Sequence, residues 1–393
     1  MGRQWAERLA SLGANVFAAM DTAKQQARQA GLEVIDLSLG SSDLAPPPSV
    51  LTAIQEALRD PETYGYNLFA STAPFREAVA RWYERKFGLG VDPETEVLPL
   101  IGSQEGTGHL PLAVLNPGDY ALLTDPGYPS HGGGVALAGG IPYWLPLRAE
   151  RGFVPDLVEI PPEIAQASRL MVLSYPHNPT TAVASLGFWQ EAVGFCQHYD
   201  LILAHDFPYV DWVFDGGLPP SVLQADPEKQ VSIEFFSLSK SFHMGGFRVG
   251  YAIGNAEVIR ALRQVKAAID FNQYQGILRG AAVALEQEWD FPKKSLAVYR
   301  QRRDVAVAAL AEIGWQVPTP PATMYVWMPL PPIGLGSMEF CLELVRRTGV
   351  ALAPGSGFGQ QGEGYVRLAL VVDPPRLRTA VERIGSFLAD WAD

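Results

Sequence analysis

Hydrophobic positions follow two different spacings along the chain. Apolar residues recur at intervals of three and four over five stretches, which predicts amphipathic helices at 49–59, 74–87, 186–198, 257–268 and 337–348. Short apolar runs alternate with these stretches and predict strands at 120–123, 170–174, 201–204, 233–237 and 249–253. Helices that alternate with short buried strands predict an α/β fold with a mostly parallel sheet flanked by helices.

The last part of the chain has a different order of elements. Strand patterns at 323–328, 350–353 and 365–371, followed by a closing helix from Pro375, predict a smaller α+β unit. A helical pattern over 275–310 precedes it, and we expect the hinge there. The 393 residues correspond to two or three domains. We therefore predict a large domain at 41–285 and a small domain formed by 1–40 and 286–393.

Composition excludes several classes of partner. The net charge is −12 and no tract is rich in Lys or Arg, which argues against nucleic acids and anionic membranes. Cys196 and Cys341 lie far apart in the sequence, so neither a disulfide framework nor a CxxC site is indicated. No apolar run approaches the roughly 20 residues of a membrane span, and the N-terminal stretch lacks the pattern of a signal peptide. We expect a cytoplasmic protein.

The strongest candidate for chemistry is Lys240, in the segment SLSKSFHMGGFRVG at 237–250. It follows an apolar strand, and open α/β sheets bind their ligands at the carboxyl ends of strands. An amine in such a crevice can have a lowered pKa and attack a carbonyl carbon. A single Lys is more often a solvated charge, but Ser237, Ser239 and Arg248 offer nearby donors for a dianionic phosphate.

Two more strand ends carry polar residues. Asp206 ends the apolar run LILAHD, with Tyr209 three residues later, and Asn178 lies in SYPHNPT after another strand. Taken singly, Asp206 and Asn178 indicate only a cap or a turn. Arg367 is the one cation in the apolar strand YVRLAL; a buried Arg needs an anion, and its planar fork suits a carboxylate.

A glycine-containing loop before a predicted helix offers a further anion site. In GSQEGTG, residues 102–108, the loop runs into a helical pattern, and exposed amides at a helix start favour phosphate. We assign Ser103, Gln104 and Glu105 to this role mainly through their backbone N–H groups. The Glu105 carboxylate itself would be an unfavourable neighbour for a phosphate.

Together and in this order, these motifs resemble the fold-type I, pyridoxal 5′-phosphate (PLP)-dependent aminotransferases of class I/II. That family has a Ser/Thr-rich approach to a Schiff-base Lys and an Arg eight residues later, as at Lys240 and Arg248. The resemblance covers nearly the whole chain from Phe17 and is greatest to the branch of the LL-diaminopimelate aminotransferases. It implies that Lys240 holds PLP as a Schiff base, with its phosphate bound by Ser103, Gln104, Glu105, Ser237, Ser239 and Arg248.

The same resemblance implies how the rest of the cofactor is held. Asp206 would pair with the pyridine nitrogen and keep it protonated, so that the ring can accept electrons. Tyr209 and Asn178 would donate to the ring's phenolic oxygen, and Tyr128 would stack on the ring. Tyr66 would reach the phosphate from the neighbouring subunit, which implies a homodimer with composite active sites.

The expected reaction is transamination between an amino acid and a 2-oxo acid, with 2-oxoglutarate as the expected acceptor. Arg367 and the backbone of Gly40 would bind the substrate carboxylate. The sequence GSSD at 40–43 and Gln104 depart from the diaminopimelate branch and leave the donor open. His243 also departs from the family, and we give it no catalytic role.

Two other functions compete with transamination. A C–S lyase or decarboxylase would share the residues that hold PLP, and the product formed from a cysteine-like substrate would distinguish it. A non-catalytic PLP-binding regulator would be expected to carry a basic DNA-binding domain ahead of Phe17, where we see none.

Overall fold

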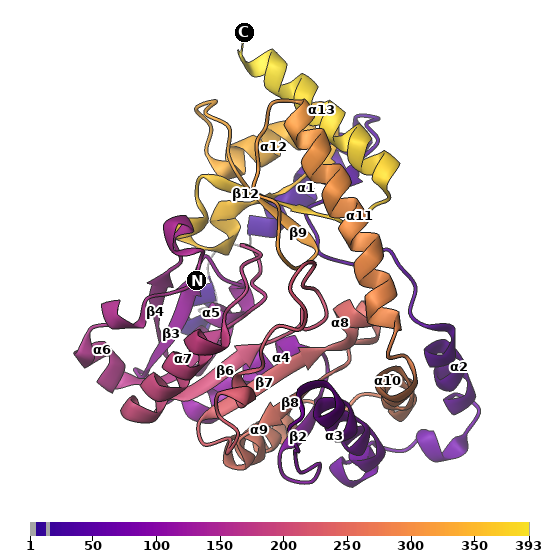
Figure 1. The fold of residues 1–393 in the computed structure, drawn as a ribbon, viewed down its shortest axis with the longest axis vertical. Coiled ribbons are helices and arrows are strands. Elements are labelled where there is room, and N and C mark those ends of the chain that lie inside the picture. The colour runs from indigo at the N-terminus through magenta and orange to yellow at the C-terminus, as the bar shows by residue number, and fades with distance from the viewer. Residues whose placement is uncertain (1–4, 13–15, 393) are drawn as a thin grey trace.

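A seven-stranded sheet forms the centre of the larger unit in the computed structural model, which describes residues 5–12 and 16–392 (Figure 1). Its strand order is β2-β8-β7-β6-β5-β3-β4. Only β8 runs antiparallel to its neighbours, β2 and β7, so the predicted mostly parallel sheet is confirmed. The strands are β2 Val97–Leu100, β3 Tyr120–Asp125, β4 Ile141–Pro146, β5 Ser168–Leu173, β6 Ile202–Asp206, β7 Ser232–Ser237 and β8 Gly250–Gly254.

Side chains that alternate along these strands build two hydrophobic cores, one on each face of the sheet. On β7, Ile233 and Phe235 pack toward one face, with helices α4 Ser103–Val114, α5 Pro129–Ala138 and α9 Ala256–Ile269. Phe236 on the same strand packs toward the other face, with helices α3 Ala73–Phe87, α7 Leu186–Tyr199 and α10 Gln275–Gln287. Helices therefore cover both faces, as predicted.

A second unit lies above the carboxyl ends of the parallel strands (Figure 1). Its three-stranded antiparallel sheet has the order β11-β12-β9, and a short parallel pair joins β1 to β10. Its elements are α1 Val16–Gln29, β1 Ile35–Asp36, α11 Phe291–Glu312, β9 Tyr325–Pro329, α12 Ser337–Thr348, β10 Val350–Ala351, β11 Ala353–Pro354, β12 Tyr365–Ala369 and α13 Pro374–Ala392. The N-terminal and C-terminal segments thus share one core.

The boundary between the units is less simple than the predicted ranges. Tyr209, Trp212 and Phe214 come from the chain after β6, yet they pack in the core of the smaller unit. The domain limits themselves stay a prediction. Residues 1–4, 13–15 and 393 of the predicted small domain lie outside the described residues. Among the described helices, none is long and apolar enough to cross a membrane.

The periodicity of the sequence did not predict several elements of the larger unit, among them β2, β4 and α5. Helix α5 has the sequence PSHGGGVALA, and its consecutive glycines are poor helix formers. Packing explains why one of them is there, because a Cβ on Gly134 would lie 3.1 Å from the backbone of α4. The remaining helices are α2 Pro48–Ala57, α6 Pro162–Ala167 and α8 Leu238–Ser241.

A buried carboxylate joins strand β7 to the elements around it. Glu234 is fully buried and accepts hydrogen bonds from the Tyr83 and Ser221 hydroxyls and from the Val222 N–H group, each at 2.9 Å. The ring nitrogen Nδ1 of His205, on β6, lies 2.9 Å from the same carboxylate. The carboxylate is tolerated in the core because each of these four groups is a hydrogen-bonding partner for it.

Replacing Glu234 with Ala should destabilise the fold strongly, because it leaves these buried donors without an acceptor. We expect the free energy of unfolding to fall by about 3–5 kcal/mol, measured by urea denaturation followed by tryptophan fluorescence. Glu382→Ala, which removes an exposed carboxylate on α13, should change it by less than about 0.5 kcal/mol. Equal midpoints for the two variants would contradict the role given to Glu234.

Candidate active site

A cavity of about 540 Å³ lies between the carboxyl ends of the parallel strands and the smaller unit. Its size is typical of a pocket for a small molecule. All the predicted site residues except Glu105 and Tyr66 line it. The predicted residues that meet there are Gly40, Ser103, Gln104, Tyr128, Asn178, Asp206, Tyr209, Ser237, Ser239, Lys240, Arg248 and Arg367.

Lys240 lies in the short helix α8, directly after strand β7. Its Nζ donates a hydrogen bond to the Gly40 carbonyl oxygen at 2.5 Å. Burial lowers the pKa of Lys240, and the cations Arg367 and Arg248 act in the same direction, against Tyr325 and Asp206. A lowered pKa leaves more of the amine neutral, which is the form that attacks a carbonyl carbon.

Asp206 ends strand β6 and presents one unpaired oxygen. Its Oδ2 lies 3.1 Å from Nε2 of His131, while Oδ1 is buried and has no partner among the described residues. A buried acceptor without a donor is costly, so the site fits a ligand that brings an N–H group, as a protonated pyridine does. His131 was missed by the sequence analysis because it lies on α5, a helix that the periodicity did not predict.

The start of helix α4 forms one end of the cavity. Ser103 and Gln104 are its first residues, and the N–H groups of a helix start have no acceptor within the helix. Gly102 precedes them with φ +77°, and the Arg248 guanidinium lies so close that a Cβ on Gly102 would be 2.5 Å from Nη2. Ser237 and Ser239 line the same cavity. This set of donors fits a phosphate group.

Two predicted phosphate ligands lie elsewhere. The Glu105 N–H group donates to the Gly102 carbonyl oxygen at 3.2 Å, and its carboxylate turns to Lys266. Its predicted phosphate contact stays a prediction. Tyr66 is 93% exposed and lies outside the cavity of its own chain. Its predicted contact with a neighbouring subunit stays a prediction.

Arg367, on strand β12, lies at the other end of the cavity. Its Nη1 donates to Asn178 Oδ1 at 2.7 Å and its Nη2 to the Ser38 carbonyl oxygen at 2.8 Å. Nε is buried and has no partner among the described residues. The guanidinium lies 4.1 Å from the centre of the Tyr325 ring and 4.6 Å from that of Phe358. These contacts hold the guanidinium group in one orientation, and its planar set of N–H donors suits a carboxylate.

A pair of tyrosines closes the wall between Lys240 and Arg367. The Tyr209 hydroxyl donates to the Tyr325 hydroxyl at 2.9 Å. Burial raises the pKa of Tyr209. Burial also acts to raise the pKa of Tyr325, but the nearby Arg367 and Lys240 hold it below its ordinary value. Tyr325 was missed by the sequence analysis, since nothing in the strand pattern of β9 separates it from a core tyrosine.

Tyr128 and His243 complete the cavity wall. The Tyr128 hydroxyl donates to Gln104 Oε1 at 3.2 Å. His243 Nε2 lies 2.8 Å from the Ser295 hydroxyl, and burial lowers the pKa of His243 to about 4, so the ring is neutral at neutral pH.

The charged side chains of the cavity are unbalanced. Among the described residues, Lys240, Arg248 and Arg367 line it together with a single carboxylate, Asp206. The protein as a whole carries a net charge of −12. A local excess of positive charge within an acidic protein marks the cavity as a site for anionic ligands.

Known proteins resemble this chain over nearly its whole length. The family described as aminotransferase class I and II matches residues 33–384. An LL-diaminopimelate aminotransferase from Syntrophobacter fumaroxidans is 41% identical over 379 residues, 96% of this chain and 97% of that protein. A solved structure of a probable N-succinyldiaminopimelate aminotransferase from Thermus thermophilus is 45% identical, with a TM-score of 0.90 over 94% of this chain and 99% of that chain. The likeness therefore covers both units of the chain.

Gly102→Ala should weaken the binding of a phosphate ligand. The new Cβ would displace the Arg248 guanidinium, and φ +77° disfavours Ala. We expect a higher Kd for PLP, measured by titrating the apoprotein and following absorbance. Gly108→Ala lies in the helix that follows, where an added Cβ meets nothing within 4 Å, and it should bind like the wild type. An unchanged Kd for Gly102→Ala would contradict the placement of the phosphate.

Proposed function

The chain belongs to the class I and II aminotransferase family and is a transaminase, and we propose that it moves an amino group to 2-oxoglutarate with PLP held by Lys240. The family is generally PLP-dependent. One observation carries the proposal: a buried amine, a carboxylate with an unpaired oxygen and a fixed guanidinium line one cavity, as Lys240, Asp206 and Arg367.

When bound, PLP supplies an electron sink for the negative charge that develops at the substrate's Cα atom. Asp206 would accept a hydrogen bond from the protonated ring nitrogen, and His131 holds the carboxylate in place through Oδ2. The phosphate would be held by the backbone N–H groups of Ser103 and Gln104 and by Arg248. The donors at one end of the cavity and the acceptor at the other would fix the orientation of the ring.

The chain's own residues would then carry out the proton transfer. Arg367 binds the α-carboxylate of the amino acid and so orients its Cα–H bond toward Lys240. The Lys240 amine would take the proton from Cα in its neutral form, and its lowered pKa increases the share of that form. Tyr209, Asn178 and Tyr128 line the same cavity and would surround the cofactor ring.

The relatives suggest the class of donor. Those named above act, by name, on LL-diaminopimelate and N-succinyldiaminopimelate. We therefore propose a donor of the diaminopimelate type, which carries a second polar group at its far end. Ser41, Ser42 and the neutral His243 line the cavity and offer hydrogen-bonding groups of this kind.

Exposed aromatic residues support a homodimer with composite sites. Tyr66 is 93% exposed, and Tyr64, Leu68, Ile269 and Phe271 are also at least half exposed. Asn272 donates to the Asn67 carbonyl oxygen at 2.9 Å, so the two segments that carry these residues lie side by side. An apolar surface of this kind is typical of an interface. Pairing there would bring Tyr66 to the partner's cavity.

Adding the correct donor to the purified holoprotein should convert the bound cofactor to its aminated form. We expect LL-diaminopimelate or its succinylated form to change the visible absorption of the bound cofactor more efficiently than glutamate, aspartate, alanine, methionine or aromatic amino acids. Lys240→Ala should show no turnover although it can still bind PLP. A wild-type protein that takes up no PLP would refute the proposal, and release of pyruvate and ammonia from cysteine would point to a lyase.

Mixing two defective chains should restore intact sites if the dimer is composite. Tyr66→Ala weakens the phosphate contact, whereas Lys240→Ala removes the amine. In a mixed dimer, one site combines Lys240 of the first chain with Tyr66 of the second. Random pairing should restore about a quarter of all sites, measured as amino-acid turnover after joint refolding. No recovery in mixtures that form dimers would contradict the role of Tyr66.

A further inference from the structure

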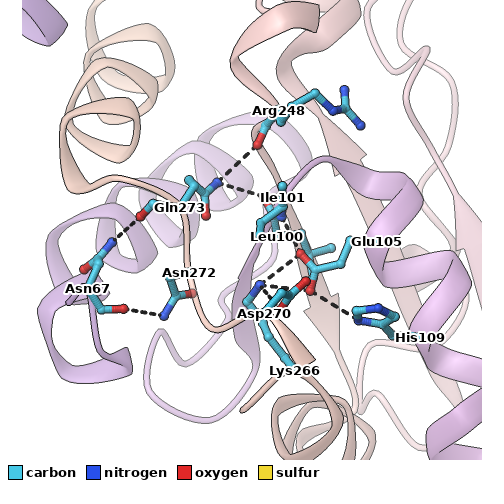
Figure 2. Close-up of polar contacts among 10 residues, drawn as sticks. All are labelled: Asn67, Leu100, Ile101, Glu105, His109, Arg248, Lys266, Asp270, Asn272 and Gln273. Atoms are coloured by element: carbon cyan, nitrogen blue, oxygen red, sulfur yellow. Dashed lines mark hydrogen bonds and ion pairs between the residues drawn. The ribbon is translucent and has the colours of Figure 1, made fainter. Parts of the chain in front are cut away.

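A buried ion pair joins Glu105, in the first turn of helix α4, to Lys266 of helix α9 (Figure 2). The side chains of Glu105 and Lys266 are 7% and 3% exposed, and the Lys266 ammonium lies 2.9 Å from both carboxylate oxygens. Glu105 also accepts the Ile101 N–H group at 2.5 Å, and Lys266 also contacts Asp270 at 3.3 Å. The pair thereby ties the first turn of α4 to the end of α9.

Two other side chains, Gln273 and Asn67, link the segments to which we assign phosphate binding. Gln273 donates through Nε2 to the carbonyl oxygen of Leu100, just before the α4 loop, at 2.9 Å and to that of Arg248 at 3.4 Å (Figure 2). Asn67, next to Tyr66, donates to the Gln273 carbonyl oxygen at 3.0 Å. The contacts therefore connect the α4 loop, Arg248 and the Tyr66 loop.

Charge explains why the pair is needed. Glu105 is the third residue of α4, and a bare carboxylate there would repel a phosphate bound at the helix start. Lys266 neutralises the Glu105 carboxylate. The hydrogen bond from the Ile101 N–H group to this carboxylate holds the loop and leaves the N–H groups of Ser103 and Gln104 free for the phosphate. Glu105, His109 and Asp270 cluster like metal ligands, but the Lys266 ammonium already contacts both carboxylates.

We propose that Glu105 and Lys266 form a positioning pair that fixes the α4 loop, against which the Arg248 guanidinium lies, for the phosphate of the cofactor. Neither side chain lines the cavity, so the pair acts through the loop. This inference rests on the proposed function, because it assumes that PLP is the ligand. It predicts that loss of the pair weakens the binding of the phosphate group and leaves the binding of the aldehyde and the ring unchanged.

The test compares PLP with pyridoxal, which has the same ring and aldehyde but no phosphate. Lys266→Met should raise the Kd of the apoprotein for PLP by about 10- to 100-fold, while the Kd for pyridoxal stays unchanged. Absorbance titration measures both without any need for turnover. The double variant Lys266→Met/Glu105→Gln should bind PLP more tightly than Lys266→Met, because the unpaired carboxylate is gone.

Lys229→Met is the matched control. Lys229 pairs with Glu96 at 3.3 Å and is 14% exposed, away from the cavity, so its loss should leave both Kd values unchanged. Lys266→Gln serves if Lys266→Met does not fold, with a smaller change in the same direction. Equal losses for PLP and pyridoxal, or a double variant no better than Lys266→Met, would overturn the inference. A wild type that binds no PLP would instead refute the proposed function.

Discussion

The excess of positive charge in the cavity is the constraint on which the rest of the site depends. Lys240, Arg248 and Arg367 face one carboxylate, Asp206, among the described residues that line the cavity. Burial and the other cations lower the pKa of Lys240. The positive charge that favours anionic ligands therefore also increases the share of the neutral, reactive amine. A dianionic phosphate at one end and a carboxylate at the other would offset this charge.

The parallel sheet makes this concentration of groups possible. Strands β5, β6 and β7 are neighbours, and each ends at the same edge. Asn178 follows β5, Asp206 ends β6 and Lys240 follows β7, so three segments deliver their groups to one place. The smaller unit adds Arg367 and Tyr325 from its own sheet. Because Tyr209 packs in that unit's core, the two units meet through the site itself.

Much of this could be predicted from residues that combine a strand end with an unusual polar group. Lys240, Asp206 and Arg367 stand out because each interrupts or ends an apolar run. His131, Tyr325 and Lys266 do not stand out in this way. His131 follows three residues after Tyr128 in a glycine-rich stretch without helical periodicity, and Lys266 reads as an ordinary charge on an amphipathic helix. Their roles depend on contacts with residues distant in sequence.

The sequence by itself determined the α/β pattern, the order of the motifs and the groups placed at the strand ends, because local periodicity and turn chemistry encode them. Only the tertiary structure decided which way each side chain turns. It directs the Glu105 carboxylate to Lys266 and away from the cavity, leaves one Asp206 oxygen without a partner among the described residues, and places the Arg248 guanidinium against Gly102. These outcomes follow from the packing of segments that are distant in sequence, some by more than a hundred residues. No local sequence pattern predicts such contacts.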